Sequence, residues 1–406
     1  MTNHAIDRTF RLLRSWRAIV AATVLGCAIA PTALAGSGLQ QIDPAVLQST
    51  LDTMAVDFLL PGAVVVLRTP DAEYILTHGV RGLDDPTPVT PDDHIRIGSN
   101  TKTMTGTVIL QMVQEGAINL GDPVSKYRPE VPNGDAITIE MLLNMRSGLF
   151  NYSTTYAMNA MLDAEPLKAW QPKEMLAIAL RYPPYFAPDQ GYRYSNTNTV
   201  LLGLIAEQID RKPLETVLHD RIFAPLGLTR TLLPAKEDNL LPKPHAKGYM
   251  FTNNVITLAT NAIPPDLQFD AEAGTLLPNE QTEVNPSWGW AAGAGISTAN
   301  ELADYVEALT DGRLLGAEMQ KLRMDSPRPT DPDNPSAALY GLAIGKFGPL
   351  YGHTGELPGY NSFMGREPVA GVTLIVWANL APAANGQDPA TTIARALLGH
   401  VYTVPL

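Results

Sequence analysis

The stretch "RIGSNTKTMTG", residues 96–106, places a serine three positions before a lysine, where an extended apolar segment gives way to a helix. Residues three apart are neighbours on a helix surface, so the Lys102 amine can reach the Ser99 hydroxyl. The Ser99 backbone N–H would point out of the helix N-terminus, where partial positive charge favours an oxyanion. A single match of this kind is more often a solvated pair, so its meaning depends on the rest of the chain.

A second motif lies 95 residues further on, in "GYRYSNTNT" (191–199), a turn that leads into a helical pattern. It places the phenol of Tyr194 two positions before the amide of Asn196. A buried tyrosine bonded to a loop is common, so this pair is also a weak signal by itself. Its value comes from its position after the serine and the lysine.

A third motif, "YGHTGELPGY" (351–360), reads as a strand that carries His353, Thr354 and Gly355. Alternation along a strand places Thr354 and Glu356 on one face, and the glycine predicts a close approach of substrate to the strand backbone. A strand histidine is more often structural than catalytic. The order of the three motifs is nevertheless the order that a Ser-Lys acyl-transfer site requires in penicillin-recognising enzymes.

The pattern of apolar residues predicts strands near both ends of the chain and helices between them. Such an arrangement favours one α/β domain, whose sheet is built from N- and C-terminal segments around an inserted helical region at about 120–290. Segment 232–290 is irregular and rich in Pro, Asn and Gly, so we expect it to serve a binding site. The expected helices are 40–60, 101–116, 137–145, 172–182, 197–211, 297–312 and 389–402, and the expected strands 62–69, 72–82, 350–360, 361–368 and 371–380.

Together the motifs resemble the serine β-lactamase and D-alanyl-D-alanine carboxypeptidase superfamily, on the branch with class C β-lactamases and family VIII esterases. The resemblance covers nearly everything after residue 35 and implies an α/β (α+β), β-lactamase/transpeptidase-like fold with an antiparallel sheet flanked by helices. Segments typical of that branch are "LLNMRSGLFNY" (142–152), "IFAPLGLTRT" (222–231), "HAKGY" (245–249) and "GAGISTANELADY" (293–305).

The resemblance implies a two-step acyl transfer through a covalent acyl-enzyme on Ser99. Either Lys102 as a neutral amine or Tyr194 as a phenolate takes the serine proton, and the sequence leaves both open. Tyr194 would then pass a proton to the leaving group. The backbone N–H groups of Ser99 and Glu356 would form the oxyanion hole.

The remaining motif residues line the substrate in this interpretation. Asn196 would bind the acyl-side amide, and His353 and Thr354 would form the opposite wall. His353 stands where β-lactamases carry a lysine, and His-Thr-Gly resembles the carboxypeptidase subgroup.

Glu356 argues against a carboxypeptidase, because we expect it to face the terminal carboxylate of a peptide and repel it. An ester, an amide without that carboxylate or a substrate with a free amine fits better. The resemblance thus implies a serine hydrolase of amides or esters, D-alanyl-D-alanine carboxypeptidase-like or esterase-like. The alternatives are a β-lactamase and a non-catalytic relative that binds cell-wall peptides.

Composition and net charge limit the classes of molecule that this protein is expected to bind. The 406 residues carry a net charge of −12 with no run of Lys or Arg in the body of the chain, which argues against nucleic acid. The histidines are dispersed without metal-ligand spacing, and no nucleotide-binding motif is present. We therefore expect no metal and no cofactor. The expected partner is a small-molecule or short-peptide substrate, with cell-wall peptide one option, and the oligomeric state is open.

The N-terminus has the layout of a secretory signal peptide. Arg8, Arg11, Arg14 and Arg17 precede the apolar run 18–30, and an A-x-A site ends at Ala35. We therefore expect an exported protein, periplasmic or secreted, with residues 1–35 removed and 36–406 forming the hydrolase domain. The alternatives are an uncleaved membrane anchor and a lipoprotein anchored through Cys27.

Overall fold

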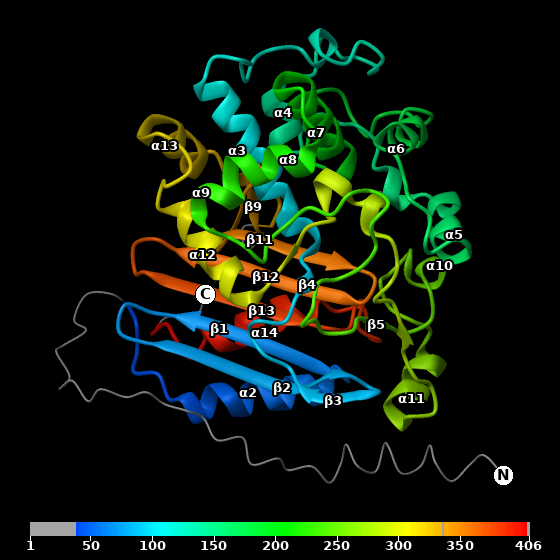
Figure 1. The fold of residues 1–406 in the computed structure, drawn as a ribbon, viewed down its shortest axis with the longest axis vertical. Coiled ribbons are helices and arrows are strands. Elements are labelled where there is room, and N and C mark those ends of the chain that lie inside the picture. Colours follow the sequence, from blue (N-terminus) through cyan, green and yellow to red (C-terminus); the bar gives the residue numbers. More distant parts are fainter. Residues whose placement is uncertain (1–37, 335–336, 404–406) are drawn as a thin grey trace.

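The computed structural model describes residues 38–334 and 337–403, and its centre is an antiparallel sheet of nine strands (Figure 1). The strand order is β3-β2-β1-β13-β12-β11-β10-β9-β8. The strands are β1 Gly62–Arg68, β2 Glu73–Gly82, β3 Asp85–Pro88, β8 Arg328–Pro329, β9 Leu339–Tyr340, β10 Gly345–Phe347, β11 Leu350–Leu357, β12 Tyr360–Glu367 and β13 Val372–Ala378. Because β1 pairs with β13, with Val65 opposite Val376, the two ends of the chain form one sheet as the sequence predicted.

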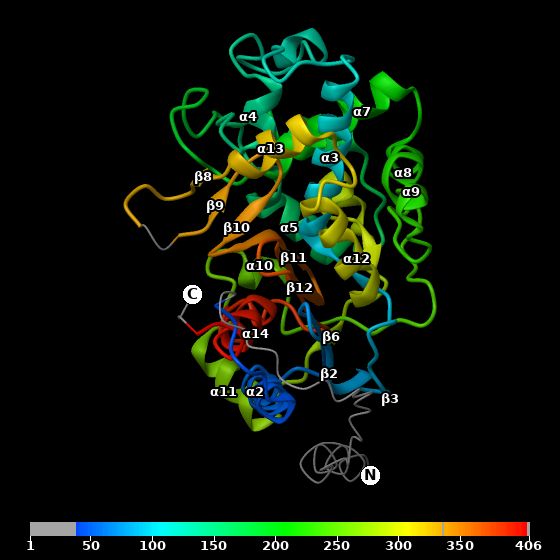
Figure 2. The ribbon, with the colours of Figure 1, turned by 90° about the vertical axis from the view of Figure 1, so that its left-hand side faces the viewer.

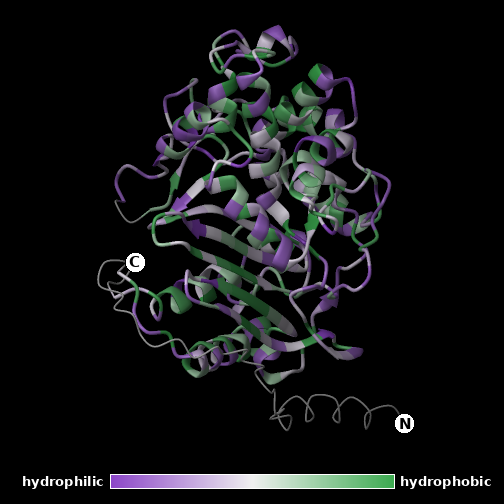
Figure 3. Ribbon diagram, turned by 60° about the vertical axis from the view of Figure 1, so that its left-hand side comes forward, coloured by the Kyte–Doolittle hydropathy of each residue, from purple (hydrophilic) through white to green (hydrophobic). Residues whose placement is uncertain are grey.

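Helices cover both faces of this sheet. Helices α2 (Pro44–Asp57) and α14 (Pro389–Leu398) lie together on one face, while α3 (Thr101–Gln114) and α12 (Ala299–Thr310) lie on the other (Figure 2). The central strands contain long apolar stretches, coloured green in Figure 3, and β13 is buried along its whole length. Alternation divides the core into two clusters, so that Val64 packs toward α3 and α12 and Val65 toward α2 and α14.

Most of the elements between the two halves of the sheet are helices. The helices between residues 101 and 226 form the upper part of Figure 1, whereas residues 254–273 lie at its right-hand edge. Segment 232–290, expected to be irregular, contains two short helices and two short strands within its loops. The remaining helices are α4 Ile139–Leu143, α5 Tyr156–Ala164, α6 Pro172–Ala179, α7 Asn196–Asp210, α8 Leu214–Leu218, α9 Ala224–Leu226, α10 Asn254–Thr257, α11 Pro265–Ala273 and α13 Ala317–Asp325. The short strand pairs are β4 Ile95–Arg96 with β7 Ile296–Ser297, and β5 Tyr249–Met250 with β6 Asn279–Glu280.

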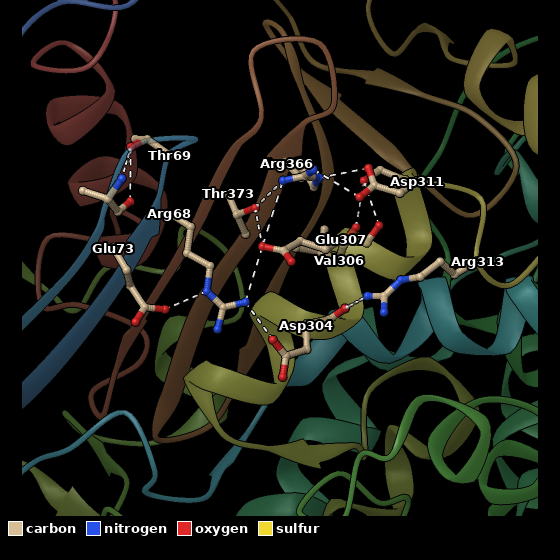
Figure 4. Close-up of polar contacts among 12 residues, drawn as sticks. Arg68, Thr69, Glu73, Asp304, Val306, Glu307, Asp311, Arg313, Arg366 and Thr373 are labelled. Carbon is tan, nitrogen blue, oxygen red and sulfur yellow. Dashed lines mark hydrogen bonds and ion pairs between the residues drawn. The ribbon is translucent and has the colours of Figure 1, made fainter. Parts of the chain in front are cut away.

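A network of ion pairs fastens α12 to the strands beneath it (Figure 4). Arg68 on β1 contacts Asp304 at 2.7 Å and Glu307 at 3.3 Å, both from α12. Arg366 on β12 contacts Asp311, just after α12, at 3.1 Å. Connected charges of this kind contribute more than isolated surface pairs, so the network helps to hold α12 on the sheet.

The expected signal peptide, residues 1–35, lies outside the described residues. Within the part that is described, none of the helices is both long and apolar enough to cross a membrane. Cys27 and the A-x-A site at Ala35 are likewise outside it, so export stays a prediction.

Candidate active site

Ser99 and Lys102 lie at the junction between a short 3-10 helix, Gly98–Asn100, and α3. Lys102 is completely buried, and its Nζ lies 2.9 Å from Ser99 Oγ and 2.6 Å from the carbonyl oxygen of Ala292. Burial lowers the pKa of the Lys102 amine well below its usual range, because a charged amine is poorly solvated there. The pair is therefore enclosed, as a basic lysine requires, and a neutral amine can accept a proton from the Ser99 hydroxyl.

Tyr194 completes this cluster from the turn that precedes α7. Its ring centroid lies 4.8 Å from Lys102 Nζ. Its hydroxyl oxygen is buried and has no hydrogen-bond partner within residues 38–334 and 337–403. Burial raises the pKa of the Tyr194 phenol well above its usual value. The Ser99 hydroxyl lowers this pKa, but its effect is smaller than that of burial. The structure thus brings together the three residues predicted to be catalytic and favours the neutral form of the phenol.

Asn196 is held by two residues to which the sequence analysis assigned no role. The Asn196 backbone N–H donates to Asn151 Oδ1 at 3.1 Å, and its Nδ2 donates to Ser153 Oγ at 3.0 Å. Asn196 Oδ1 is buried and unpaired among the described residues, which leaves an acceptor free for a substrate N–H. Asn151 belongs to the segment "LLNMRSGLFNY", whose resemblance to the family was the available signal.

His353 lies close to Tyr194, with ring centroids 6.0 Å apart, and both of its ring nitrogens are engaged. Nδ1 lies 2.6 Å from the carbonyl oxygen of Thr354, so it carries the proton and donates it. Nε2 lies 3.1 Å from Tyr340 Oη and accepts from that hydroxyl. Burial, followed by the proximity of Lys102, lowers the pKa of His353 to about 3. Tyr340, on the two-residue strand β9, was not anticipated. Its hydrogen bond to Nε2 favours the neutral form of the His353 ring.

Gly355 corrects one expectation. A Cβ at this position would lie 2.0 Å from Ile97 O, 2.5 Å from Ser362 Oγ and 2.8 Å from Asn100 Nδ2. Ile97 and Asn100 flank the turn that carries Ser99. The lack of a side chain at Gly355 therefore allows this turn to pack directly against β11. We expected substrate to approach the strand backbone at Gly355. The expectation was wrong, because the group that approaches the strand there is the turn that carries Ser99.

The Glu356 backbone lies beside the turn that carries Ser99. A Cβ on Gly98 would lie 2.5 Å from Glu356 N, so this N–H adjoins the turn that carries Ser99. Gly98 has a φ of +53°, a left-handed conformation that suits glycine. The Glu356 backbone N–H therefore lies beside the turn that carries Ser99, which is where a second oxyanion donor would be needed.

The Glu356 side chain does not point at the catalytic cluster. Thr354 and Glu356 share one face of β11 as predicted, but Thr354 pairs with Phe363, which belongs to the core under α2 and α14. The Glu356 carboxylate accepts from Asn361 Nδ2 at 3.3 Å, and Asn361 Oδ1 accepts from the first turn of α14. Although the side chain is exposed to solvent, the surrounding protein and the carboxylate of Asp388 raise its pKa.

The charge argument built on Glu356 therefore fails, because its carboxylate lies at the N-terminus of α14. His353 faces Lys102 and Tyr194 from the other side of β11. The side chain that a substrate carboxylate would meet on this wall is a neutral histidine, not a glutamate.

Comparisons with known proteins agree with the fold of this chain. The family model described as Beta-lactamase matches residues 52–398. A β-lactamase from Pseudomonas fluorescens is 23% identical over 345 residues, which cover 82% of this chain and 92% of that protein. A D-stereospecific amidohydrolase from Streptomyces sp. has a similar structure, with a TM-score of 0.74 and 30% identity, covering 87% of this chain and 98% of the other. A D-amino acid amidase from Ochrobactrum anthropi SV3 has a TM-score of 0.72 and 27% identity over 87% and 96% of the two chains.

Proposed function

This chain belongs to the β-lactamase family and is a serine β-lactamase-fold hydrolase, and we propose that it cleaves amides or esters whose reacting end carries no carboxylate. The observation that carries the proposal is the contact of 2.9 Å between Ser99 Oγ and a buried Lys102 amine. Burial lowers the pKa of that amine and so favours its neutral form, and a neutral amine is the base that a serine nucleophile needs.

Acylation then runs through Lys102. The Ser99 hydroxyl gives its proton to Lys102 Nζ while Ser99 Oγ attacks the substrate carbonyl, and the resulting oxyanion is met by the N–H groups of Ser99 and Glu356. The bond from the carbonyl carbon to the leaving nitrogen or oxygen breaks as the proton moves from Lys102, through the Tyr194 hydroxyl, to that atom. The raised pKa of Tyr194 supports this order, because a phenolate base is disfavoured in the resting site.

Deacylation reverses the same steps with water as the nucleophile. Water gives a proton to the Lys102–Tyr194 pair as its oxygen attacks the acyl carbon. The bond to Ser99 Oγ then breaks, the proton returns to that oxygen, and the acid product leaves. No other co-reactant is required.

Two observations support a substrate that lacks a carboxylate beside His353. Both nitrogens of His353 are already bonded, to Thr354 O and Tyr340 Oη, and the ring is neutral at pH 7. A carboxylate entering there would be desolvated without a charged partner, which is unfavourable. The structural relatives named as a D-stereospecific amidohydrolase and a D-amino acid amidase also point to amides.

The first test asks whether Ser99 is the nucleophile. We expect a fluorophosphonate or a fluorescent penicillin to add its acyl or phosphonyl mass to the Ser99 peptide of the wild type and nothing to Ser99→Ala. Removal of a nucleophile normally reduces kcat by orders of magnitude, so residual turnover within about tenfold of wild type would contradict the proposal. A wild type that gains no adduct and hydrolyses nothing would instead indicate a non-catalytic binding relative.

The second test concerns the substrate. Four compounds compared side by side are D-phenylalanine amide, p-nitrophenyl butyrate, nitrocefin and a D-Ala-D-Ala peptide. We expect hydrolysis of the amide and the ester, slow turnover of nitrocefin, and weak release of D-alanine. Release of D-alanine faster than cleavage of both carboxylate-free compounds would establish a carboxypeptidase.

We also propose that the protein acts outside the cytoplasm, on a small-molecule or short-peptide substrate. The basic and apolar segment that ends at Ala35 supports export. Intact mass of the secreted protein should give a chain that begins at Gly36. A lipid-modified Cys27 would establish the lipoprotein alternative, and a full-length membrane-bound chain the anchor.

A further inference from the structure

Tyr340 on β9 is a buried residue that contacts two of the three motifs, although it belongs to none of them. Its hydroxyl lies 3.1 Å from His353 Nε2. Its ring meets the Tyr194 ring edge-on, with the centroids 6.1 Å apart, and the centroid of the Tyr192 ring lies at 6.0 Å. The mechanism described above gives Tyr340 no part, so the purpose of these contacts is open.

The direction of the hydrogen bond between Tyr340 and His353 follows from the other ring nitrogen. A neutral imidazole has one N–H donor and one acceptor nitrogen. Nδ1 lies 2.6 Å from the Thr354 carbonyl oxygen, which can only accept, so Nδ1 carries the hydrogen. Nε2 is therefore the acceptor, and the Tyr340 hydroxyl is the donor that satisfies it.

The position of Tyr340 is fixed by the turn that follows β9. This strand pairs with β8 and β10 near the edge of the sheet (Figure 2), and has only two residues. In the turn, Ala343 O accepts from Arg323 Nη2 at 3.2 Å, and the same buried guanidinium donates to Thr107 Oγ1 on α3 at 2.6 Å. A Cβ on Gly106 would lie 2.1 Å from the Ala343 Cβ, so the turn packs directly on α3. Tyr340 is thereby tied to the helix that carries the catalytic lysine.

The Tyr194 hydroxyl is a second donor close to His353. The two ring centroids lie 6.0 Å apart, and Tyr194 Oη has no hydrogen-bond partner within residues 38–334 and 337–403. A buried acceptor without a donor is costly, so a free Nε2 would favour any arrangement in which Tyr194 donates to it. Because Tyr340 already donates to Nε2, this competition does not arise in the wild type.

We propose that Tyr340 is a positioning residue, which satisfies His353 Nε2 and so leaves the Tyr194 hydroxyl free to protonate the leaving group. The proposal rests on the part that Tyr194 takes in the proposed acyl transfer. Without the Tyr340 hydroxyl, Nε2 and the leaving atom would compete for one hydrogen. The loss should therefore appear in proton delivery to the leaving group and not in the attack by Ser99.

Three butyryl substrates that differ in the leaving group test the proposal on Tyr340→Phe. p-Nitrophenolate is a weak base that leaves without a proton, phenolate is a stronger base, and the nitrogen of butyryl p-nitroanilide leaves only as a protonated amine. We expect kcat/KM to stay within about threefold of wild type for p-nitrophenyl butyrate and to fall by about tenfold or more for phenyl butyrate and the anilide, since general acid catalysis matters only for the latter two. Equal losses on all three substrates, or no loss on any, would overturn the proposal.

A probe that needs no proton from Tyr194 separates positioning from a general structural role. Fluorophosphonate labelling joins Ser99 Oγ to phosphorus and expels fluoride, so its rate should be unchanged in Tyr340→Phe. A labelling rate that falls as far as the hydrolysis of phenyl butyrate would mean that Tyr340 only supports the fold. Tyr249→Phe is the matched control, because Tyr249 is similarly buried, its hydroxyl accepts from Leu83 N at 2.8 Å, and it belongs to the core under α2 and α14. Its kcat/KM values should keep the wild-type ratios.

A second background shows whether Tyr340 acts through His353. His353→Leu removes the acceptor nitrogen, so adding Tyr340→Phe to it should leave the ratio of p-nitrophenyl to phenyl butyrate unchanged. Non-additivity of this kind is the signature of residues that act as one unit. A further rise of the ratio in the double variant, as large as in the wild-type background, would show that Tyr340 acts by another route.

The outcomes separate this inference from the function on which it rests. If the wild type hydrolyses none of the three substrates and Ser99 gains no adduct, the proposed function itself fails. If the wild type hydrolyses them at Ser99 and Tyr340→Phe keeps the same dependence on the leaving group, acyl transfer stands and only the role of Tyr340 is refuted.

Discussion

Gly355→Ala should disable the enzyme although the substitution adds a single methyl group. The new Cβ would lie 2.0 Å from Ile97 O, whereas side-chain carbons essentially never approach another heavy atom within 3.0 Å, so about 1 Å of separation must be gained. Ile97 O is a backbone atom, so β11 and the turn that carries Ser99 have to move apart. Overpacking of this kind costs about 1–3 kcal/mol of stability.

The same displacement acts on catalysis. Glu356 N, one residue beyond Gly355, is the proposed second donor of the oxyanion hole, and a misplacement of about 1 Å can cost about 100-fold in rate. We therefore expect kcat/KM for p-nitrophenyl butyrate to fall by about that factor, with a lower midpoint in urea unfolding. Gly121→Ala is the matched control, since its Cβ would meet nothing within 4 Å, and it should leave both values unchanged or raise stability slightly. A Gly355→Ala variant with wild-type rate and midpoint would refute the contact between β11 and the catalytic turn.

Three further predictions concern protons and charges. Tyr194→Phe should lower kcat by about 100-fold or more while leaving the free energy of unfolding equal or higher, because the buried hydroxyl has no hydrogen-bond partner among the described residues; an unchanged rate would route the proton through Lys102 or water alone. Acylation, measured as kcat/KM against pH, should be lost as pH falls through the lowered pKa of Lys102, because a protonated amine accepts no proton. The unfolded chain binds that proton below a pH of about 10.4, whereas the folded chain binds it only below the lowered pKa of Lys102. Wild-type stability should therefore fall relative to Lys102→Met as pH is lowered from about 10.4 toward that pKa, and parallel curves for the two proteins would contradict a lowered pKa. Glu307→Ala removes the carboxylate shared by Arg68 and Thr373 and should lower the free energy of unfolding by about 1–2 kcal/mol, less in high salt; a loss that does not depend on salt would mean that packing, not charge, holds α12.

Periodicity and turn residues were sufficient to predict most of the sheet and its main helices. The strands expected at 62–69 and 371–380 are β1 and β13, and the expected helix 297–312 contains α12 with Thr298 as its N-cap. These elements are long and apolar on a regular period, so local sequence specifies them. The helix Tyr156–Ala164 and the two-residue strand that carries Tyr340 were not predicted, because each depends on contacts with distant segments.

In the candidate site, the limit of what the sequence could predict is even clearer. The motif spacings placed Ser99, Lys102 and Tyr194 in one cluster, since a helix turn and the family order fix their relation. Alternation also placed Thr354 and Glu356 on one face of β11. It gives only the relative direction of side chains, however, and not which helical layer lies over each face. The Glu356 carboxylate was therefore assigned to the wrong side of the sheet, whereas its backbone N–H, which the alternation does not affect, lies beside the turn that carries Ser99.

Burial shifts the pKa values of the amine and the phenol in the site in opposite directions. The same loss of solvent lowers the pKa of the Lys102 amine and raises that of the Tyr194 phenol, which favours the neutral form of both, and it lowers the pKa of His353 to about 3. Charge first develops when the Ser99 proton reaches Lys102, and the groups around that step are Ala292 O, which accepts from the amine, and the backbone N–H groups beside Ser99. A site built this way stabilises charge that forms during the reaction and offers little to a substrate that brings a carboxylate with it.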